Sequence, residues 1–424
     1  MFKWIALGSM AIVLSLKTLA APIDTLSLSL NEAERRFLQN NALILAQQFN
    51  IEAARAQIIQ AKLWDNPSFF LEQTLKSRSV VAGDDRITAF GQRGVQVQQL
   101  FLLAGKRNKK VTLENLNVQL NEQNYYDLIR TLQYQLHKAF FTIFYSQQSL
   151  KMYAEEIATI SRTVGLYKEQ LAKGNIPLKE VMRLQSFLFD LEQGQFELTS
   201  NVLEQQKVLK VLMNDASSAY LKPVTTPENI EKLSLKGNSF ESLYETAIAN
   251  RADLKASEMG IEFEKANLSL QKALAHPDIR GGFSYDRAGS YIPNYTALTL
   301  GIDLPVFNRN QGNIKTAEYR IKGSEKFRDQ AYINVRSELW EAHQKALETD
   351  RVYGAVDKQF LTNFDTLLEG VLSNYQKRNL SLIEFIDFYE SYKNSVINYN
   401  QLLNRRIQTY VELNYYSGKN VFKF

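Results

Sequence analysis

The chain contains no cysteine among its 424 residues. This excludes a disulfide framework, a thiolate metal site, a cysteine nucleophile and a lipid anchor on an N-terminal cysteine. Histidine is nearly as scarce, and His137, His276 and His343 each stand alone in the sequence, which is typical of packing or surface residues. No His-x-x-x-His or Gly-x-Ser-x-Gly motif occurs, and Gly105-Lys106 lacks the Ser or Thr that follows the lysine of a phosphate loop. We therefore predict no enzyme activity, no cofactor and no metal site.

The chain also lacks a strong excess of charge of either sign. Its net charge is +5, and 22% of its residues are charged while 45% are hydrophobic. A nucleic-acid-binding protein would carry basic residues clustered on one face, so we predict no nucleic-acid partner. The densest basic run, residues 106–110, is expected to be a solvated helix start.

Long hydrophobic runs are missing as well. The longest uncharged run near the start, Trp4 to Leu16, is shorter than the ~20 residues that cross a bilayer. It follows Lys3 and precedes Thr18-Leu19-Ala20, which together predict a signal peptide at residues 1–20. Every later apolar run is interrupted by charge within a few residues. An exported chain of this kind is expected to be periplasmic, secreted, or a β-barrel.

The two halves of the chain repeat each other. At an offset of 210 residues, eight residues recur: Asn40, Ala42, Ala46, Ile51, Glu52, Ala56, Lys62 and Pro67 return as Asn250, Ala252, Ala256, Ile261, Glu262, Ala266, Lys272 and Pro277. At an offset of 204, four more recur: Lys173, Asn175, Leu178 and Glu180 return as Lys377, Asn379, Leu382 and Glu384. We predict a tandem duplication with a first repeat at 21–214, a linker at 215–237, a second repeat at 238–418 and a tail at 419–424.

Each repeat is predicted to open with helix and strand. The helical stretches, rich in Ala, Leu, Glu, Gln and Lys, are expected at residues 31–64 and 239–275. Strands are expected at about 68–77 and 93–103 in the first repeat and at about 278–288 and 294–306 in the second. In the last of these, Leu298, Leu300, Ile302 and Leu304 alternate with small or polar residues. This alternation suits a transmembrane barrel strand or a hairpin packed on a soluble core, and does not by itself separate the two.

Each repeat then continues into a long helical hairpin. The outgoing helices are predicted at about 106–172 and 313–375, and the returning helices at 178–213 and 382–415. At 1.5 Å per residue the first would extend ~100 Å. Apolar residues recur at three-four spacing along it, as a coiled coil requires: Ile129, Leu132, Leu136, Phe140 and Ile143. Such hairpins are too long for a globular domain, so we predict a rod or tube.

This order of elements resembles the TolC-type outer-membrane efflux protein family over nearly the whole mature chain. The resemblance is carried by Asn66-Pro67, by His276-Pro277, by the strand-to-helix joins at 100–107 and 304–307, and by the two hairpin turns. The first turn, residues 174–181, is similar to that of the heavy-metal, CzcC-like branch. The implied fold is mainly α with a small β part. Three copies would form a trimeric α-barrel and a 12-stranded outer-membrane β-barrel, with four strands from each protomer.

The resemblance also implies which residues contact the partner and which form the gate. The turns would contact a periplasmic adaptor protein through Gly174, Asn175, Ile176, Pro177, Asn379, Leu380 and Ser381. Glu384 and Asp387 match the acidic gate residues that ring the closed periplasmic entrance, where some of six carboxylates would be protonated or held by cations. The alternative is that both lie on a solvated helix face. Leu380 stands where relatives carry a charged latch residue, and Arg378 replaces the small residue usual in the second turn.

The implied function is that of the exit duct of a tripartite efflux system. Its partners would be two further copies, the adaptor, an inner-membrane pump of the RND type and outer-membrane lipid. Its place would be the outer membrane, with the helices in the periplasm, and its substrate heavy-metal cations or drugs. Two other functions stay open: the exit duct of a type I protein secretion system, and a periplasmic coiled-coil adaptor or structural protein.

Overall fold

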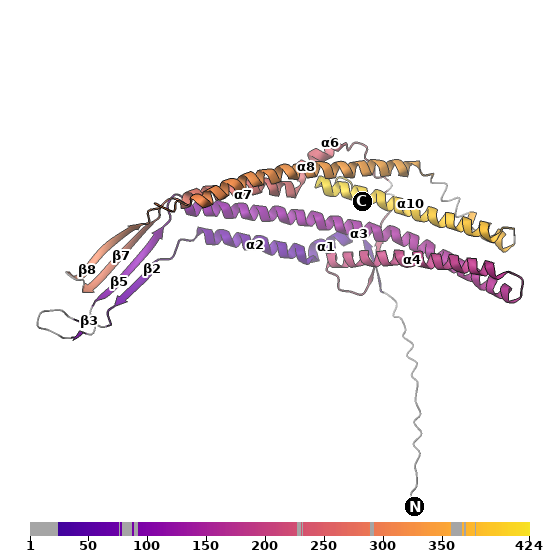
Figure 1. Ribbon diagram of the computed structural model, residues 1–424, viewed down its shortest axis with the longest axis horizontal. Coiled ribbons are helices and arrows are strands. Elements are labelled where there is room, and N and C mark those ends of the chain that lie inside the picture. Colours follow the sequence, from indigo (N-terminus) through magenta and orange to yellow (C-terminus); the bar gives the residue numbers. More distant parts are fainter. Residues whose placement is uncertain are drawn as a thin grey trace, which may run out of the picture.

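The protein, described by a computed structural model, is elongated and mainly helical, with a small β part (Figure 1). This confirms the predicted fold class. The structure describes residues 24–75, 77–78, 87–88, 92–226, 230, 232–288, 292–357, 367–368, 370–377 and 379–424. The predicted signal peptide and Arg378 lie outside these residues. A four-stranded sheet lies at one end of the molecule, and the turns of the helical hairpins lie at the other.

The first half holds two short helices, a strand pair and a long hairpin. In chain order its elements are β1 (Thr25–Ser29), α1 (Leu30–Asn40), α2 (Ala42–Lys62), β2 (Ser68–Gln73), the short β3 (Ser77–Arg78) and β4 (Ile87–Thr88), β5 (Arg93–Phe101), α3 (Lys106–Ala172) and α4 (Leu178–Met213). The bounds of α3 and α4 are those predicted. Continuous three-four apolar spacing without proline accounts for their length.

The second half repeats this order after a connecting strand. Its elements are β6 (Tyr220–Val224), α6 (Phe240–Asn250), α7 (Ala252–Leu274), β7 (Ile279–Ala288), β8 (Pro293–Ile302), α8 (Gln311–Ala355) and α10 (Leu382–Ser417). Strand β6 pairs in parallel with β1. The observed β2, β5 and β8 end two to four residues before the predicted strand ends. After β8, Pro305 has no N–H with which to continue a ladder.

The opening helical stretch of each repeat is broken, where the sequence predicts one continuous helix. The breaks fall at Asn41 and Arg251, which stand 210 residues apart and share an extended backbone (ψ 118° and 120°). The Asn41 carboxamide caps the following helix by accepting the N–H groups of Leu43 and Ile44 at 3.0 and 3.1 Å. Its Nδ2 donates to the Leu212 carbonyl at 2.8 Å, which secures the break in the tertiary structure.

The second outgoing helix is also interrupted. The prediction of one helix over 313–375 is wrong, because α8 ends at Ala355 and Val356 takes an extended backbone (φ −75°, ψ 124°). Gly354, a poor helix former, stands two residues before the break. The chain is helical again over residues 370–376, just before the second turn.

The four-stranded sheet is antiparallel, in the order β2-β5-β7-β8. The register joins Phe69 to Val97, Val97 to Phe283, and Phe283 to Leu298. Directly opposed residues share a face, so these four side chains lie on one apolar face, as the alternation predicts. The opposite face carries Gln98, Ser284 and Asp286 among other polar or small residues.

The sheet is tied to the helices by a buried lysine. Lys106, at the start of α3, is 5% exposed, and its Nζ lies 2.7 Å from both the His276 carbonyl oxygen and Asp278 Oδ2. The expected solvated basic run is therefore wrong for Lys106. Because His276 and Asp278 precede β7, this ion pair joins the two repeats where sheet and helices meet.

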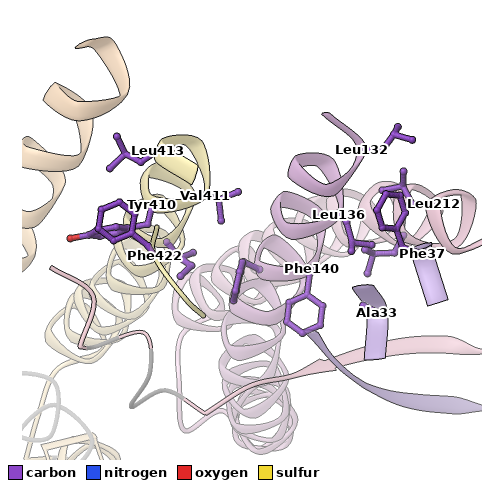
Figure 2. Close-up of a cluster of buried hydrophobic side chains, with 14 of the residues drawn as sticks. Ala33, Phe37, Leu132, Leu136, Phe140, Leu212, Tyr410, Val411, Leu413 and Phe422 are labelled. Carbon is purple, nitrogen blue, oxygen red and sulfur yellow. The ribbon is translucent and has the colours of Figure 1, made fainter. Parts of the chain in front are cut away.

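A large cluster of buried apolar side chains joins α1, α3, α4 and α10 (Figure 2). In it Phe37 of α1 and Leu212 of α4 lie beside Leu136 of α3. The predicted tail, residues 419–424, folds back onto this cluster: the Phe422 ring lies 4.8 Å from that of Tyr410. None of the helices that the structure describes has both the length and the apolar character needed to cross a membrane.

Candidate gate and hairpin turns

The first hairpin turn, between α3 and α4, is held by its own backbone. Gly174 has a φ of +74°, a conformation that glycine adopts without a steric penalty. Its N–H donates to Leu171 O at 2.9 Å, and the Asn175 N–H donates to Gln170 O at 3.0 Å. These two bonds form a Schellman motif, which ends the helix sharply. The Asn175 Nδ2 adds a bond to Gln170 Oε1 at 2.8 Å.

The second turn repeats part of this arrangement. The Asn379 N–H donates to Asn374 O at 2.9 Å, and its Nδ2 donates to Asn374 Oδ1 at 3.4 Å. The donors and acceptors of the two turns are related by the 204-residue offset that the sequence predicts. Both asparagines therefore occupy equivalent places at the same end of the molecule.

The residues expected to contact an adaptor are brought together at this end. Gly174, Asn175, Pro177, Asn379 and Ser381 are exposed, whereas Ile176 and Leu380 are partly buried. Leu380 packs against a second group of buried side chains, the tip cluster, whose fully buried members include Tyr389, Phe385, Ile160 and Leu184. This packing gives Leu380 a structural role in the turn.

Glu384 forms hydrogen bonds with Ser381 at the start of α10. The Ser381 N–H and Oγ–H donate to Glu384 Oε2 at 2.8 and 2.7 Å, and the Glu384 N–H returns a bond to Ser381 Oγ, which completes a capping box. These bonds from Ser381 lower the pKa of the Glu384 carboxyl below its ordinary 4.5. Glu384 therefore stays ionised at neutral pH.

Asp387 lies one turn further along α10. Glu384 and Asp387 are both exposed, while Leu382, Phe385, Ile386 and Tyr389 of the same helix are buried. Asp387 lines a cleft between α4 and α10 together with Arg183, its counterpart in the first repeat, and with Asp190 and Glu390. The two predicted gate residues thus project on the side of α10 that faces away from the protomer's core.

One acidic residue of this end was missed by the sequence analysis. Glu156 of α3 is 3% exposed and lies on the same helix stripe as the buried Tyr153 and Ile160. The signal was present, because a glutamate at three-four spacing between apolar residues is expected to face the core. Within the described residues, no group of three His, Cys, Asp or Glu side chains is placed to hold a metal ion.

Removing the cap of α10 provides a first prediction. Ser381→Ala deletes the hydroxyl of the capping box and is expected to cost about 1 kcal/mol of helix stability. Amide exchange in the first turn of α10 should therefore become about five-fold faster, as measured by hydrogen–deuterium exchange. Ser381→Thr retains the hydroxyl and serves as the control. Equal exchange in Ser381→Ala and the wild type would show that the cap does not hold this turn.

The chain is similar to one known protein by sequence and to others by structure. The cobalt-zinc-cadmium resistance protein CzcC of Cupriavidus metallidurans is 22% identical over 304 residues, which cover 69% of this chain and 68% of that protein. A crystal structure of CusC matches with a TM-score of 0.73 and 17% identity, covering 92% of both chains. The CmeC outer membrane channel of Campylobacter jejuni matches with a TM-score of 0.74 and 14% identity, covering 92% of this chain and 85% of that one.

At these identities the two structural matches establish the fold. By sequence, residues 35–215 match the family described as outer membrane efflux protein. The matched range begins in α1 and ends just after α4, so it spans all the elements of the first repeat after β1. The first repeat therefore matches the outer membrane efflux protein family, and the chain as a whole has the fold of the two solved relatives.

Proposed function

We propose that this chain is the outer-membrane channel of a tripartite efflux system, which receives substrate from an inner-membrane pump through a periplasmic adaptor. The main support for the proposal is the exposed apolar face of the four-stranded sheet. Its one apolar face is exposed to an unusual degree, with Leu298 at 88%, Leu300 at 80% and Leu71 at 67%. A contiguous apolar surface of this kind requires a nonpolar environment, and its polar reverse face suits a water-filled channel.

The open edges of the sheet support a closed trimer. Strands β2 and β8 each have one neighbour in the four-stranded sheet. Unpaired backbone groups are not tolerated in hydrocarbon, so β8 of one copy would pair with β2 of the next until the barrel closes. With four strands from each of three copies, the barrel would have twelve.

An apolar stripe on α4 supports the same assembly. Met182, Phe189, Phe196 and Leu203 recur at seven-residue spacing, and all four are more than half exposed in the single chain. A heptad stripe is the pattern by which one helix packs against another. We infer that these side chains pack against a helix of the neighbouring copy, so that the hairpins of three copies enclose an α-barrel in the periplasm.

The transported substrate is proposed from the relatives. CzcC is named for cobalt, zinc and cadmium resistance, which favours divalent metal cations as the substrate. The exposed carboxylates of Glu384 and Asp387 at the entrance would attract such cations. The duct would carry out no covalent chemistry. Metal sensitivity of a deletion strain would support this substrate class over the secretion of a protein.

The location of the chain tests the proposal. We expect the mature protein in the outer-membrane fraction, as a trimer that resists detergent and dissociates on heating. Leu298→Arg should impair insertion, because a cation on the lipid face of a barrel costs about 2–4 kcal/mol near the bilayer midplane. Fractionation and gel electrophoresis of unheated samples would measure both.

The adjacent residue is the matched control. Ala297 lies on the polar face, opposite Ser284, so Ala297→Arg should insert and assemble as the wild type does. Recovery of the wild-type chain as a soluble periplasmic monomer would contradict the proposed function. Equal insertion of the two arginine variants would contradict the assignment of the lipid-facing side.

A further inference from the structure

A glutamate is buried without a partner inside the hairpin end of the molecule. Glu156 lies in α3, eighteen residues before Gly174, which places it ~27 Å along the helix from the first turn. It is 3% exposed, and neither of its carboxylate oxygens has a hydrogen-bond partner among the described residues. Natural proteins rarely leave a buried carboxyl in this state, so the residue calls for an explanation.

The helices packed around Glu156 place few charges near it. Together with burial, the charge of Glu156 raises the pKa of Tyr153 on α3 and of Tyr389 on α10. The positive charge of Lys393 on α10 lowers the pKa of Glu156. On α4, the charge of Glu197 contributes, after burial and Glu156, to the raised pKa of Tyr153. Lys393 is not within ion-pair distance of Glu156; its Nζ lies 5.9 Å from the centroid of the Phe187 ring of α4.

The backbone of α4 closes the space from the other side. A Cβ added to Gly194 would lie 2.5 Å from the Tyr153 hydroxyl, so α4 approaches α3 closely, one turn from Glu156. The tip cluster fills the remaining surroundings with apolar and aromatic side chains. Water has little access to the carboxyl, and burial raises the pKa of Glu156 to about 8 although Lys393 acts in the opposite direction.

We propose that Glu156 is a proton-binding site that controls how α10 packs against the α3–α4 hairpin. The neutral carboxyl lets the three helices close around it, and loss of its proton loosens them. The proposal that this loosening opens the duct rests on the proposed channel function. Tyr389 connects the two places: burial and the charge of Glu156 raise its pKa, and it is buried on α10 two residues after the exposed Asp387.

The sign of the pH effect follows from the two pKa values. The carboxyl has a pKa of about 8 when the helices are closed and about 4.5 when water reaches it. The closed packing is therefore fully stable below pH 4.5 and loses stability as the pH rises to about 8. Over this window the equilibrium for local opening increases by up to about tenfold per pH unit, and above it the equilibrium levels off.

The neighbouring groups with shifted pKa values titrate outside this window. Glu384 loses its charge below pH 4.5, and the pKa values of Tyr153 and Tyr389 are raised above their ordinary 10 by burial. A Glu384→Gln/Asp387→Asn background removes the entrance carboxylates altogether. The pH dependence of Glu156 can therefore be measured in the presence and in the absence of the charged ring.

Hydrogen–deuterium exchange on the intact trimer is the direct test. The variants are Glu156→Gln, which is always neutral, Glu156→Met, which is apolar, and Glu155→Gln as the control, since Glu155 is exposed on the same turn. Exchange of segments 150–165 and 385–393 is compared with the wild type at each pH, so that the intrinsic pH dependence of exchange cancels. The wild type and Glu155→Gln should exchange faster than both Glu156 variants by a ratio that grows between pH 5 and 8.

Planar-bilayer recordings of the same proteins test the link to the duct. The open fraction of the wild type and of Glu155→Gln should rise from pH 5 to 8, and that of both Glu156 variants should stay constant. A constant exchange ratio between wild type and Glu156→Gln would overturn the proton site. A growing ratio with unchanged gating would overturn its coupling to the entrance. Absence of any conductance would instead count against the proposed channel function, and the exchange result would still decide the proton site.

Discussion

Replacing Asn175 and Asn379 with aspartate together should abolish efflux while the proposed trimer still assembles. Each asparagine donates its Nδ2–H to an acceptor oxygen, Gln170 Oε1 in the first turn and Asn374 Oδ1 in the second. Aspartate has no such donor and would place a negative charge beside that oxygen, close to the negative end of a helix dipole. A trimer would gain six negative charges on the surface proposed to meet the adaptor.

The expected readout is a loss of resistance equal to that of a deletion strain, together with loss of crosslinks from the turns to the adaptor. A matched control is Asn201→Asp with Asn394→Asp, which adds the same charge at exposed positions on α4 and α10, away from the turns. The control should retain efflux. Wild-type resistance in the Asn175→Asp/Asn379→Asp variant would show that the turns do not form the adaptor contact.

Neutralising the proposed gate should remove cation selectivity and cation block. Glu384→Gln with Asp387→Asn takes six carboxylates from the entrance of a trimer and preserves side-chain shape. The fold is expected to survive, because glutamine at position 384 can accept the same two bonds from Ser381 and belongs equally to a capping box. Without these charges the entrance no longer attracts cations, so block by divalent or trivalent ions should disappear.

Planar-bilayer recordings of purified trimer would measure both properties. The charge-matched control is Glu192→Gln with Glu204→Gln, at two exposed positions on α4. It should keep the selectivity and block of the wild type. If the Glu384→Gln/Asp387→Asn variant also keeps them, these residues are ordinary solvated side chains, and the gate lies elsewhere on the returning helices.

The helices whose bounds are marked by local sequence patterns were predictable from the sequence. The bounds of α3 and α4 follow from unbroken apolar spacing and from the turn residues between them. The breaks at Asn41 and Arg251 were not predicted, because local contacts form only part of each and distant partners complete them: Leu212 accepts from Asn41, and Glu338 pairs with Arg251 at 2.9 Å. A helix stop of this kind is decided by tertiary contacts, which local propensity does not report.

The features of the candidate site likewise fall into those that the sequence predicted and those that only the tertiary structure revealed. The sequence alone established the duplication, the two turns and the acidic pair three residues apart, since each is a matter of residue types and spacing. Only the tertiary structure decided that Leu380 packs inward and that Glu156 is buried without a partner. The charge state of a carboxyl depends on the donors and the water around it, and those are supplied by segments far apart in the chain.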